Sequence, residues 1–123
     1  MLKSHKKVKG FTLIELVIVL VLLGILAAIV IPKYVDLSAS ATTTAEQASA
    51  ASVKSAFAIY IAENKTLPTV TLLAADIQGG TAVATGVQVT INGATKIVQT
   101  YTDSACTAAT AAAGNTVACV GDI

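Results

Sequence analysis

Arginine and tryptophan are absent from this 123-residue chain, which also has only one histidine, two prolines and two cysteines. Aromatic residues make up only 4% of the sequence. Any soluble core must therefore be modest, because few large side chains are present to fill it. Below about 80 residues, such cores usually need disulfides, metals or neighbouring molecules to be stable.

Positive charge is concentrated at the start of the chain. Residues 1–10 contain four lysines and no acid, and the remainder has four lysines against seven acids, a formal net charge of −3. The body of the protein therefore lacks the basic patch with which proteins bind nucleic acid, and we predict no nucleic-acid site. By the positive-inside rule, the lysine-rich leader stays in the cytoplasm and the rest of the chain lies outside the inner membrane.

A long apolar run follows this leader. Residues 11–31 are apolar except for Thr12, Glu15 and Gly24, and as a helix these twenty-one residues span roughly 30 Å, the thickness of a bilayer's hydrocarbon. Glu15 is the one charge in the run. A carboxylate in hydrocarbon costs ~2–4 kcal/mol on insertion scales. An acid retained at such a cost is expected to have a function.

The helical pattern has two weak points and then changes character. Gly24 and Pro32 predict a local kink or a melted stretch between them, because proline removes a backbone hydrogen bond and clashes with the preceding turn. Residues 35–63 continue the helix, and their apolar side chains gather on one face, whereas the first half is apolar all round. That face contains Ala50, Val53, Phe57, Tyr60 and Ile61. We predict one long helix that ends near Asn64.

Strand signals appear only in the last third of the chain. Residues 66–85 are predicted to form a loop with little regular structure. Apolar and polar residues alternate over 87–91, Asn92-Gly93 supplies a turn, and a return strand covers 95–102. A short third strand is expected at 117–120.

The register of this hairpin depends on its turn. A plain two-residue turn would place Lys96 and Val98 on the apolar face of the first strand, whereas one bulged residue would place Ile97 and Tyr101 there. We favour the bulge, because it keeps Lys96 out of the core.

The two cysteines, Cys106 and Cys119, both lie near the C-terminus. An exported chain with two cysteines is expected to pair them. The resulting disulfide would stabilise the fold by ~3 kcal/mol on the loop-entropy model. The alternative, two free thiols in a reducing cytosol, requires the membrane-length segment to have no meaning.

Gly10-Phe11 is a candidate processing site, because glycine lets a protease approach the backbone closely. One alternative is an ordinary secretory signal peptide cleaved beside Ala39-Ser40-Ala41. The apolar stretch is longer than the usual 7–15 or so residues, however, and it contains Glu15. A second alternative, an uncleaved membrane anchor, explains the length but not the placement of the glycine and the glutamate.

Residues 9–32 resemble, without a gap, the N-terminus of the type IV pilins, the subunits of bacterial pili. The resemblance implies that a prepilin peptidase cuts after Gly10 and methylates the new amine of Phe11. Residues 1–10 would then be a leader that is absent from the mature protein.

The same resemblance implies how subunits assemble. The carboxylate of Glu15 is implied to pair with the N-terminal ammonium of an adjacent subunit, and a buried acid is tolerable when it meets a buried cation with good geometry. The stretch from Gly24 to Pro32 is implied to melt in assembled fibres, which agrees with the two weak points of the helix.

The resemblance also implies a fold. Type IV pilin heads have an antiparallel sheet packed on the helix and a C-terminal disulfide loop, which Cys106 and Cys119 fit. The short leader and Phe11 suit the type IVa branch, and residues 32–37 resemble the mannose-sensitive haemagglutinin group. We therefore predict an α+β pilin fold in three segments: a leader (1–10), a membrane or filament-core helix half (11–34) and a globular head (35–123).

No catalytic set of residues is present. His5 lies in the leader, so histidine chemistry is excluded from the mature protein, and no acid belongs to a calcium-loop pattern. A site shared by Asp103 and Asp122 near the disulfide is the alternative to their being solvated loop acids. We predict no enzymatic activity, no metal and no cofactor.

The predicted function is that of a structural subunit which polymerises with itself, for adhesion, twitching motility or DNA uptake. Its other partners would be the prepilin peptidase and the assembly machinery of the inner membrane. The precursor would lie in that membrane and the polymer on the cell surface. Two alternatives stay open: a minor pilin or type II secretion pseudopilin, and a membrane-anchored binding module that never polymerises and can dispense with Glu15.

Overall fold

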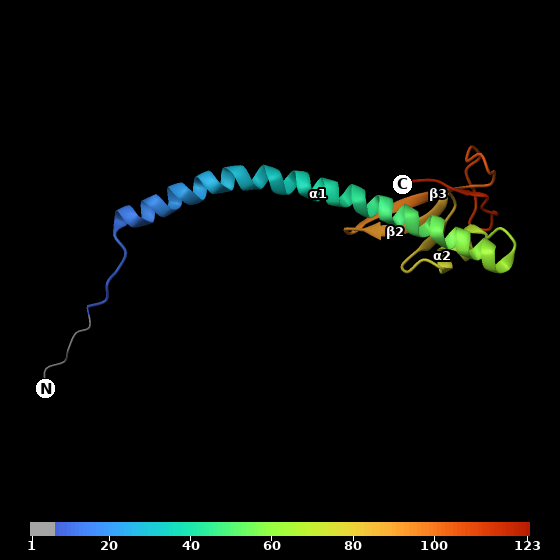
Figure 1. Ribbon diagram of the computed structural model, residues 1–123, viewed down its shortest axis with the longest axis horizontal. Helices are drawn as coiled ribbons and strands as arrows, with labels where there is room; N and C mark the ends of the chain where they lie inside the picture. The colour runs from blue at the N-terminus through green and yellow to red at the C-terminus, as the bar shows by residue number, and fades with distance from the viewer. Residues whose placement is uncertain (1–6) are drawn as a thin grey trace, which may run out of the picture. The chain divides into compact units, whose positions relative to one another are not determined.

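The computed structural model describes residues 7–123, so the sequence predictions for residues 1–6, including the place of His5 in the leader, lie outside the described residues. Its elements are α1 (Leu13–Asn64), α2 (Val70–Ala75), β1 (Thr81–Val83), β2 (Gly86–Ile91), β3 (Ala94–Tyr101) and β4 (Cys119–Val120) (Figure 1). The chain forms two compact units, Met1–Ser38 and Ala39–Ile123, and α1 contributes residues to both. A long helix with an antiparallel sheet in the order β1-β2-β3-β4 confirms the α+β prediction.

The end of α1 is where the sequence predicts it. Lys65 adopts a left-handed backbone conformation with φ of 58°, and its N–H donates to the Ile61 carbonyl at 2.9 Å, which terminates the helix after Asn64. Gly24 and Pro32 both lie inside α1, and the residues between them are helical. A kink or melting of this stretch in an assembled fibre stays a prediction.

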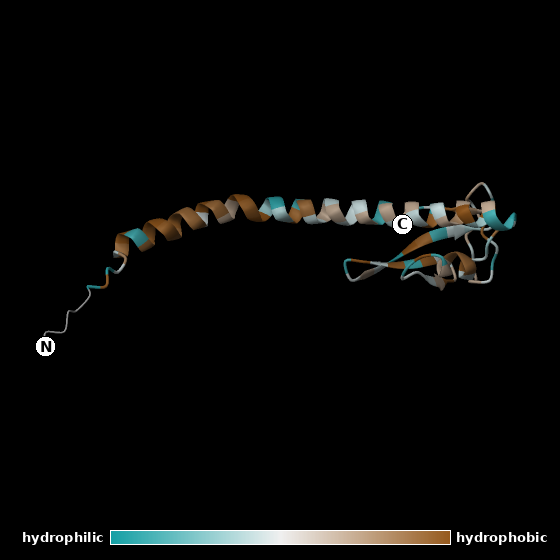
Figure 2. Ribbon diagram, turned by 60° about the horizontal axis from the view of Figure 1, so that its bottom comes forward, coloured by the Kyte–Doolittle hydropathy of each residue, from teal (hydrophilic) through white to brown (hydrophobic). Residues whose placement is uncertain are grey.

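The two halves of α1 differ in composition and burial. Figure 2 shows the N-terminal half as mainly apolar, with a hydrophilic stretch near its start, and the C-terminal half as mixed. In the second unit, Ala50 and Val53 are buried against the core, and the other predicted members of their face are partly buried: Phe57, Tyr60 and Ile61. The predicted amphipathic face is therefore confirmed.

The prediction of an irregular loop over residues 66–85 is wrong, because this segment contains α2 and β1. The hydroxyl of Thr69 caps α2 by accepting from the Leu72 N–H at 3.3 Å. Leu73, fully buried on the inner side of α2, packs in the core. Both elements are too short to show a clear period in the sequence, and packing against the rest of the head stabilises them.

The predicted bulge between β2 and β3 is also wrong. The register is regular throughout, and the turn residues Asn92 and Gly93 both have positive φ, 51° and 80°, as a tight two-residue turn requires. Val98 is consequently fully buried opposite Val87, whereas Ile97, which the bulge would have placed in the core, is 37% exposed.

Lys96 shares the face of Val98 without burying its charge. Its Nζ lies 3.0 Å from Oε1 of Glu46 on α1, and its side chain remains 42% exposed. The lysine stem therefore covers apolar surface while the ammonium reaches an acid. Tyr101, the other residue that the bulge would have placed inside, is only partly buried, and its hydroxyl donates to Oε1 of Gln99 at 3.0 Å.

The C-terminal segment closes the head. β4 is shorter than the predicted strand and pairs antiparallel with the end of β3. A disulfide joins Cys106 to Cys119, with 5.5 Å between the Cα atoms, as predicted. The Val117 N–H donates to the Pro68 carbonyl at 2.8 Å, which fixes this segment to the start of α2.

The core of the second unit is small and aliphatic, as the scarcity of aromatic residues suggests. Its buried members are Ala50, Val53, Val70, Leu73, Ala74, Val87, Val89, Ile91, Val98, Val117 and Val120. The buried hydroxyls of Thr100 and Thr110 lie 2.8 Å apart and bond to each other. Among residues 7–123, every buried polar side-chain atom has a hydrogen-bond partner.

Candidate functional site

The predicted processing bond lies just outside the helix. Gly10 and Phe11 precede α1 without regular structure, and Phe11 is 92% exposed. No described atom beyond its chain neighbours lies within 4 Å of the place that a side chain at position 10 would occupy. The bond between Gly10 and Phe11 is therefore accessible. The fold has room for a larger side chain at position 10, so any requirement for glycine there would come from an enzyme that cleaves this bond.

Glu15 takes part in a reciprocal cap at the start of α1. The Thr12 N–H donates to Oε2 of Glu15 at 2.9 Å, and the Glu15 N–H donates to the hydroxyl of Thr12 at 3.3 Å. This arrangement is a capping box, which satisfies backbone donors that the first helical turn leaves without partners. It also explains why α1 begins at Leu13 and leaves the processing bond outside the helix.

Sequence reasoning missed Thr12, although the signal was present. A threonine three residues before a glutamate, at the start of an apolar run, is the sequence pattern of a capping box. The structure also places Phe11 and Glu15 on one apolar groove of about 520 Å³, completed by Leu16, Ile18 and Val19. The two residues predicted to act in assembly therefore lie beside each other.

The first part of α1 has a mainly apolar surface, in which Lys33 and Asp36 are the charges besides Glu15. Each residue of α1 from position 13 to 38 is exposed, and the large side chains among them are mainly leucine, isoleucine and valine. Within residues 7–123, α1 is the one helix long and apolar enough to cross a membrane by length and composition. Apolar surface of this extent marks a region that contacts lipid or other protein chains.

In the head, Asp103 organises the loop that the disulfide closes. Its carboxylate accepts from the Thr107 hydroxyl at 2.6 Å, from the Ala108 N–H at 2.8 Å and from the Thr107 N–H at 3.0 Å. These bonds, the Thr107 hydroxyl first, hold the pKa of Asp103 below its ordinary value. The acid thus has a structural role in its own loop.

Asp103 and Asp122 have different hydrogen-bond partners. Asp122 accepts instead from Nζ of Lys54 on α1 at 2.6 Å, which joins the chain's end to the helix. Over residues 7–123, no group of three or more histidine, cysteine, aspartate or glutamate side chains is arranged to hold a metal ion.

Comparison with known proteins agrees with the N-terminal features. Residues 5–31 match the family model described as the prokaryotic N-terminal methylation motif. The chain is 47% identical over 74 residues to the type IV narrow pilus major component PilA5 of Thermus thermophilus, which covers 60% of this chain and 64% of that protein. It is 47% identical over 60 residues to a fimbrial protein of Pseudomonas aeruginosa, covering 49% of this chain and 39% of the relative.

A third relative is the type IV major alpha-pilin of Moraxella bovis, 47% identical over 58 residues, or 47% of this chain and 36% of the relative. The chain thus spans less than two thirds of the length of each of these relatives. No solved structure shows significant similarity to it.

Proposed function

We propose that this chain, whose N-terminal methylation motif and similarity to type IV pilins are described above, is a structural subunit that polymerises into a type IV pilus. The observation that carries the proposal is the exposed apolar half of α1, because such a surface is stable only in lipid or against other helices. Copies of the chain, packed side by side through residues 11–37, would cover it. The protein has a structural role and is not an enzyme.

Maturation would begin with cleavage between Gly10 and Phe11. Because the bond is exposed and lies outside α1, a prepilin peptidase could cut it without unwinding the helix. Cleavage creates an ammonium group at Phe11, which the same enzyme would methylate. Before cleavage the precursor would lie in the inner membrane, with its lysine-rich leader in the cytoplasm.

In the fibre, the carboxylate of Glu15 would pair with the ammonium at Phe11 of an adjacent subunit. Until then the capping box gives this acid a partner within its own chain, which favours its retention in an apolar segment. Assembly machinery of the inner membrane would extract the subunits, and the finished pilus would stand on the cell surface. The role that we propose for it is adhesion, twitching motility or DNA uptake.

The experiment that tests this function is the replacement of Glu15 in the full chain, expressed in a pilus-forming bacterium that lacks its own major pilin. We expect Glu15→Ala to remove the protein from sheared fibres while its amount in the membrane fraction is unchanged. Glu15→Gln separates pairing from capping, because glutamine can still complete a capping box but carries no charge. We expect this variant to be excluded from fibres as well.

The matched control is Glu63→Ala, which removes an exposed acid from the other end of α1. It should enter fibres normally. Normal fibres from both Glu15 variants would contradict the pairing, and a wild-type chain confined to membranes would favour the monomeric binding module. A chain that is the dominant protein of the sheared fibres is a major subunit, whereas a trace component is a minor one.

A further inference from the structure

Two charges in the apolar half of α1 have no role in the proposed assembly. Residues 11–38 contain three charged side chains, Glu15, Lys33 and Asp36. Lys33 and Asp36 are both exposed, and neither belongs to the two ion pairs found among residues 7–123. Their neighbours Val35 and Leu37 are large, apolar and about two-thirds exposed, at 65% and 66%. The apolar surface thus continues past these charges.

The two charges are poorly placed to satisfy each other. They lie three residues apart on the helix, with the lysine before the acid, and this order gives the weaker pair within a helix. Once the surface around them is covered, a charge without a partner becomes costly, whereas a bonded pair is tolerated. Packing of this surface therefore requires partners from outside the chain.

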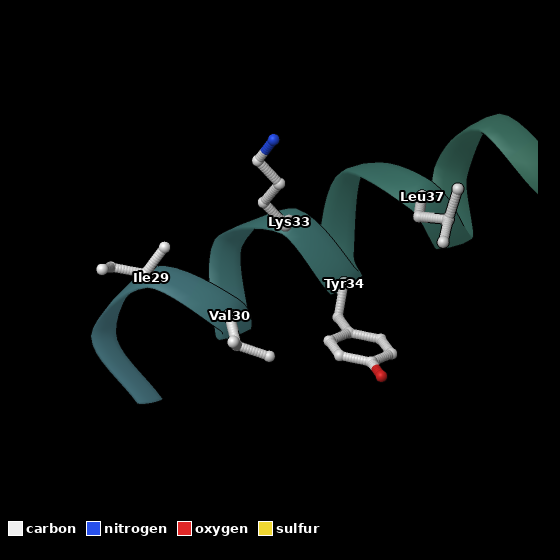
Figure 3. A pocket seen from close by; sticks show the side chains of 5 residues that line it. All are labelled: Ile29, Val30, Lys33, Tyr34 and Leu37. Carbon is white, nitrogen blue, oxygen red and sulfur yellow. The ribbon is translucent and has the colours of Figure 1, made fainter. Parts of the chain in front are cut away.

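The surface beside Lys33 has a shape that suits another helix. Lys33 borders a groove of about 270 Å³ that is otherwise lined by Ile29, Val30, Tyr34 and Leu37. Figure 3 shows the Lys33 ammonium extending away from the helix, on the opposite side from the Tyr34 ring. An apolar side chain of a second copy could fill the groove while an acid of that copy meets the ammonium.

The spacing of the charges along the helix identifies the acid of the second copy that would meet the Lys33 ammonium. Pairing of Glu15 with the amine of Phe11 in a parallel neighbour joins positions four residues apart, an axial offset of about 6 Å for helices. Because the copies are identical, the same offset applies along their whole length, on both sides of any melted stretch. It brings Asp36 of one copy level with position 32 of its neighbour, next to Lys33.

We infer that Asp36 of one subunit pairs with Lys33 of the adjacent subunit, as a second ionic contact in register with the one between Glu15 and the N-terminal amine. This contact rests on the proposed polymerisation. After cleavage the exposed half carries two cations and two acids, and the two contacts pair all four of them. The occupant of this surface is therefore another copy of the same chain.

Charge reversal tests the contact in the full chain, expressed in the same pilus-forming host. The variants are Lys33→Glu and Asp36→Lys, each expressed alone and then both expressed together in one cell. Glu63→Lys and Lys65→Glu are matched controls, because they reverse exposed charges beyond the apolar half. The measurement is the ratio of subunit in sheared fibres to subunit in membranes, by quantitative mass spectrometry.

We expect each single reversal to lower this ratio by roughly ten-fold or more, because like charges then face each other between subunits, while both controls match the wild type. Co-expression should restore fibres that contain the two variants in near-equal amounts, since the acid at position 33 of one variant then faces the lysine at position 36 of the other. A pair formed within one chain could not be rescued in this way.

Three results would overturn the contact while wild-type fibres form. The first is that both single variants form normal fibres. The second is that the double variant Lys33→Glu/Asp36→Lys restores fibres but co-expression of the single variants does not. The third is that Lys33→Glu is lost from the membrane fraction. The last result would assign the lysine to lipid headgroups. Failure of the wild-type chain to enter fibres would instead overturn the proposed function, and the contact with it.

Discussion

Residues 13–38 and 39–64 are parts of one helix, yet they differ in composition and in how much of their surface is buried. Each residue of the first part is exposed, and its large apolar side chains point in all directions. The second part is rich in alanine, serine and threonine, and it buries Ala50 and Val53 against the sheet. A helix with one apolar face can pack that face into a core, whereas a helix that is apolar all round needs lipid or other helices around it. The comparison indicates that the folded core lies in residues 39–123, and in the proposed function the exposed part would mediate assembly.

The largest expected effect is in the core of the head. Leu73 is fully buried, and Leu73→Ala should lower the free energy of unfolding by about 4 kcal/mol through lost burial and the cavity left behind. Denaturant unfolding of the mature chain in detergent, followed by tyrosine fluorescence, measures this change. Leu72→Ala is the control, because Leu72 lies next to it but is 45% exposed. If both variants lowered stability equally, the assignment of the core would be wrong.

Removal of the disulfide should have the next largest effect. Replacing Cys106 and Cys119 together by serine should reduce the free energy of unfolding of the head by ~3 kcal/mol. Insertion of the apolar half into membranes should be unchanged, because insertion depends on the apolar length of residues 11–31. Chemical reduction of the wild type should reproduce the loss, and an unchanged midpoint after reduction would show that the bond adds no stability.

The smallest effect is expected at the start of α1. Thr12→Val keeps the size of the side chain but removes the hydroxyl that accepts from the Glu15 N–H, which should destabilise the first turn by about 1 kcal/mol. Amide hydrogen exchange of residues 13–16 in detergent micelles would show faster exchange. Thr12→Ser should exchange as the wild type does, and neither variant should change the unfolding of the head. Slow exchange in Thr12→Val would mean that the hydroxyl is not the cap.

Features with a local cause could be predicted from the sequence. The length of α1 follows from its apolar period and the change at Asn64, and the Asn92-Gly93 turn follows from two residues that tolerate positive φ. The pairing of the two cysteines could be predicted because the sequence predicts that the chain is exported, and exported chains usually pair their cysteines. Thr12 belongs to this group as well, because its spacing from Glu15 is a local pattern that was overlooked.

Other features depend on contacts between distant segments. Lys96 can lie on the same face of β3 as Val98 because Glu46, fifty residues earlier in the chain, pairs with its ammonium at 3.0 Å. α2 has six residues, too few to form alone, and it exists because Leu73 enters a core built by β2, β3 and α1. Such elements lack a sequence signal of their own, since their stability comes from the folded head.

The disulfide loop has a consequence for how this protein can vary. Its backbone is held by Asp103, which precedes the loop, and by the Thr110 hydroxyl, which bonds to that of Thr100. Within the loop, Oδ1 of Asn115 accepts from two successive backbone N–H groups at 2.9 Å. The exposed side chains between these anchors, such as that of Ala112, contribute little to that support. Mutations at the outward positions can therefore accumulate without loss of the loop's shape, so that the exposed surface of the loop can evolve faster than the scaffold that displays it.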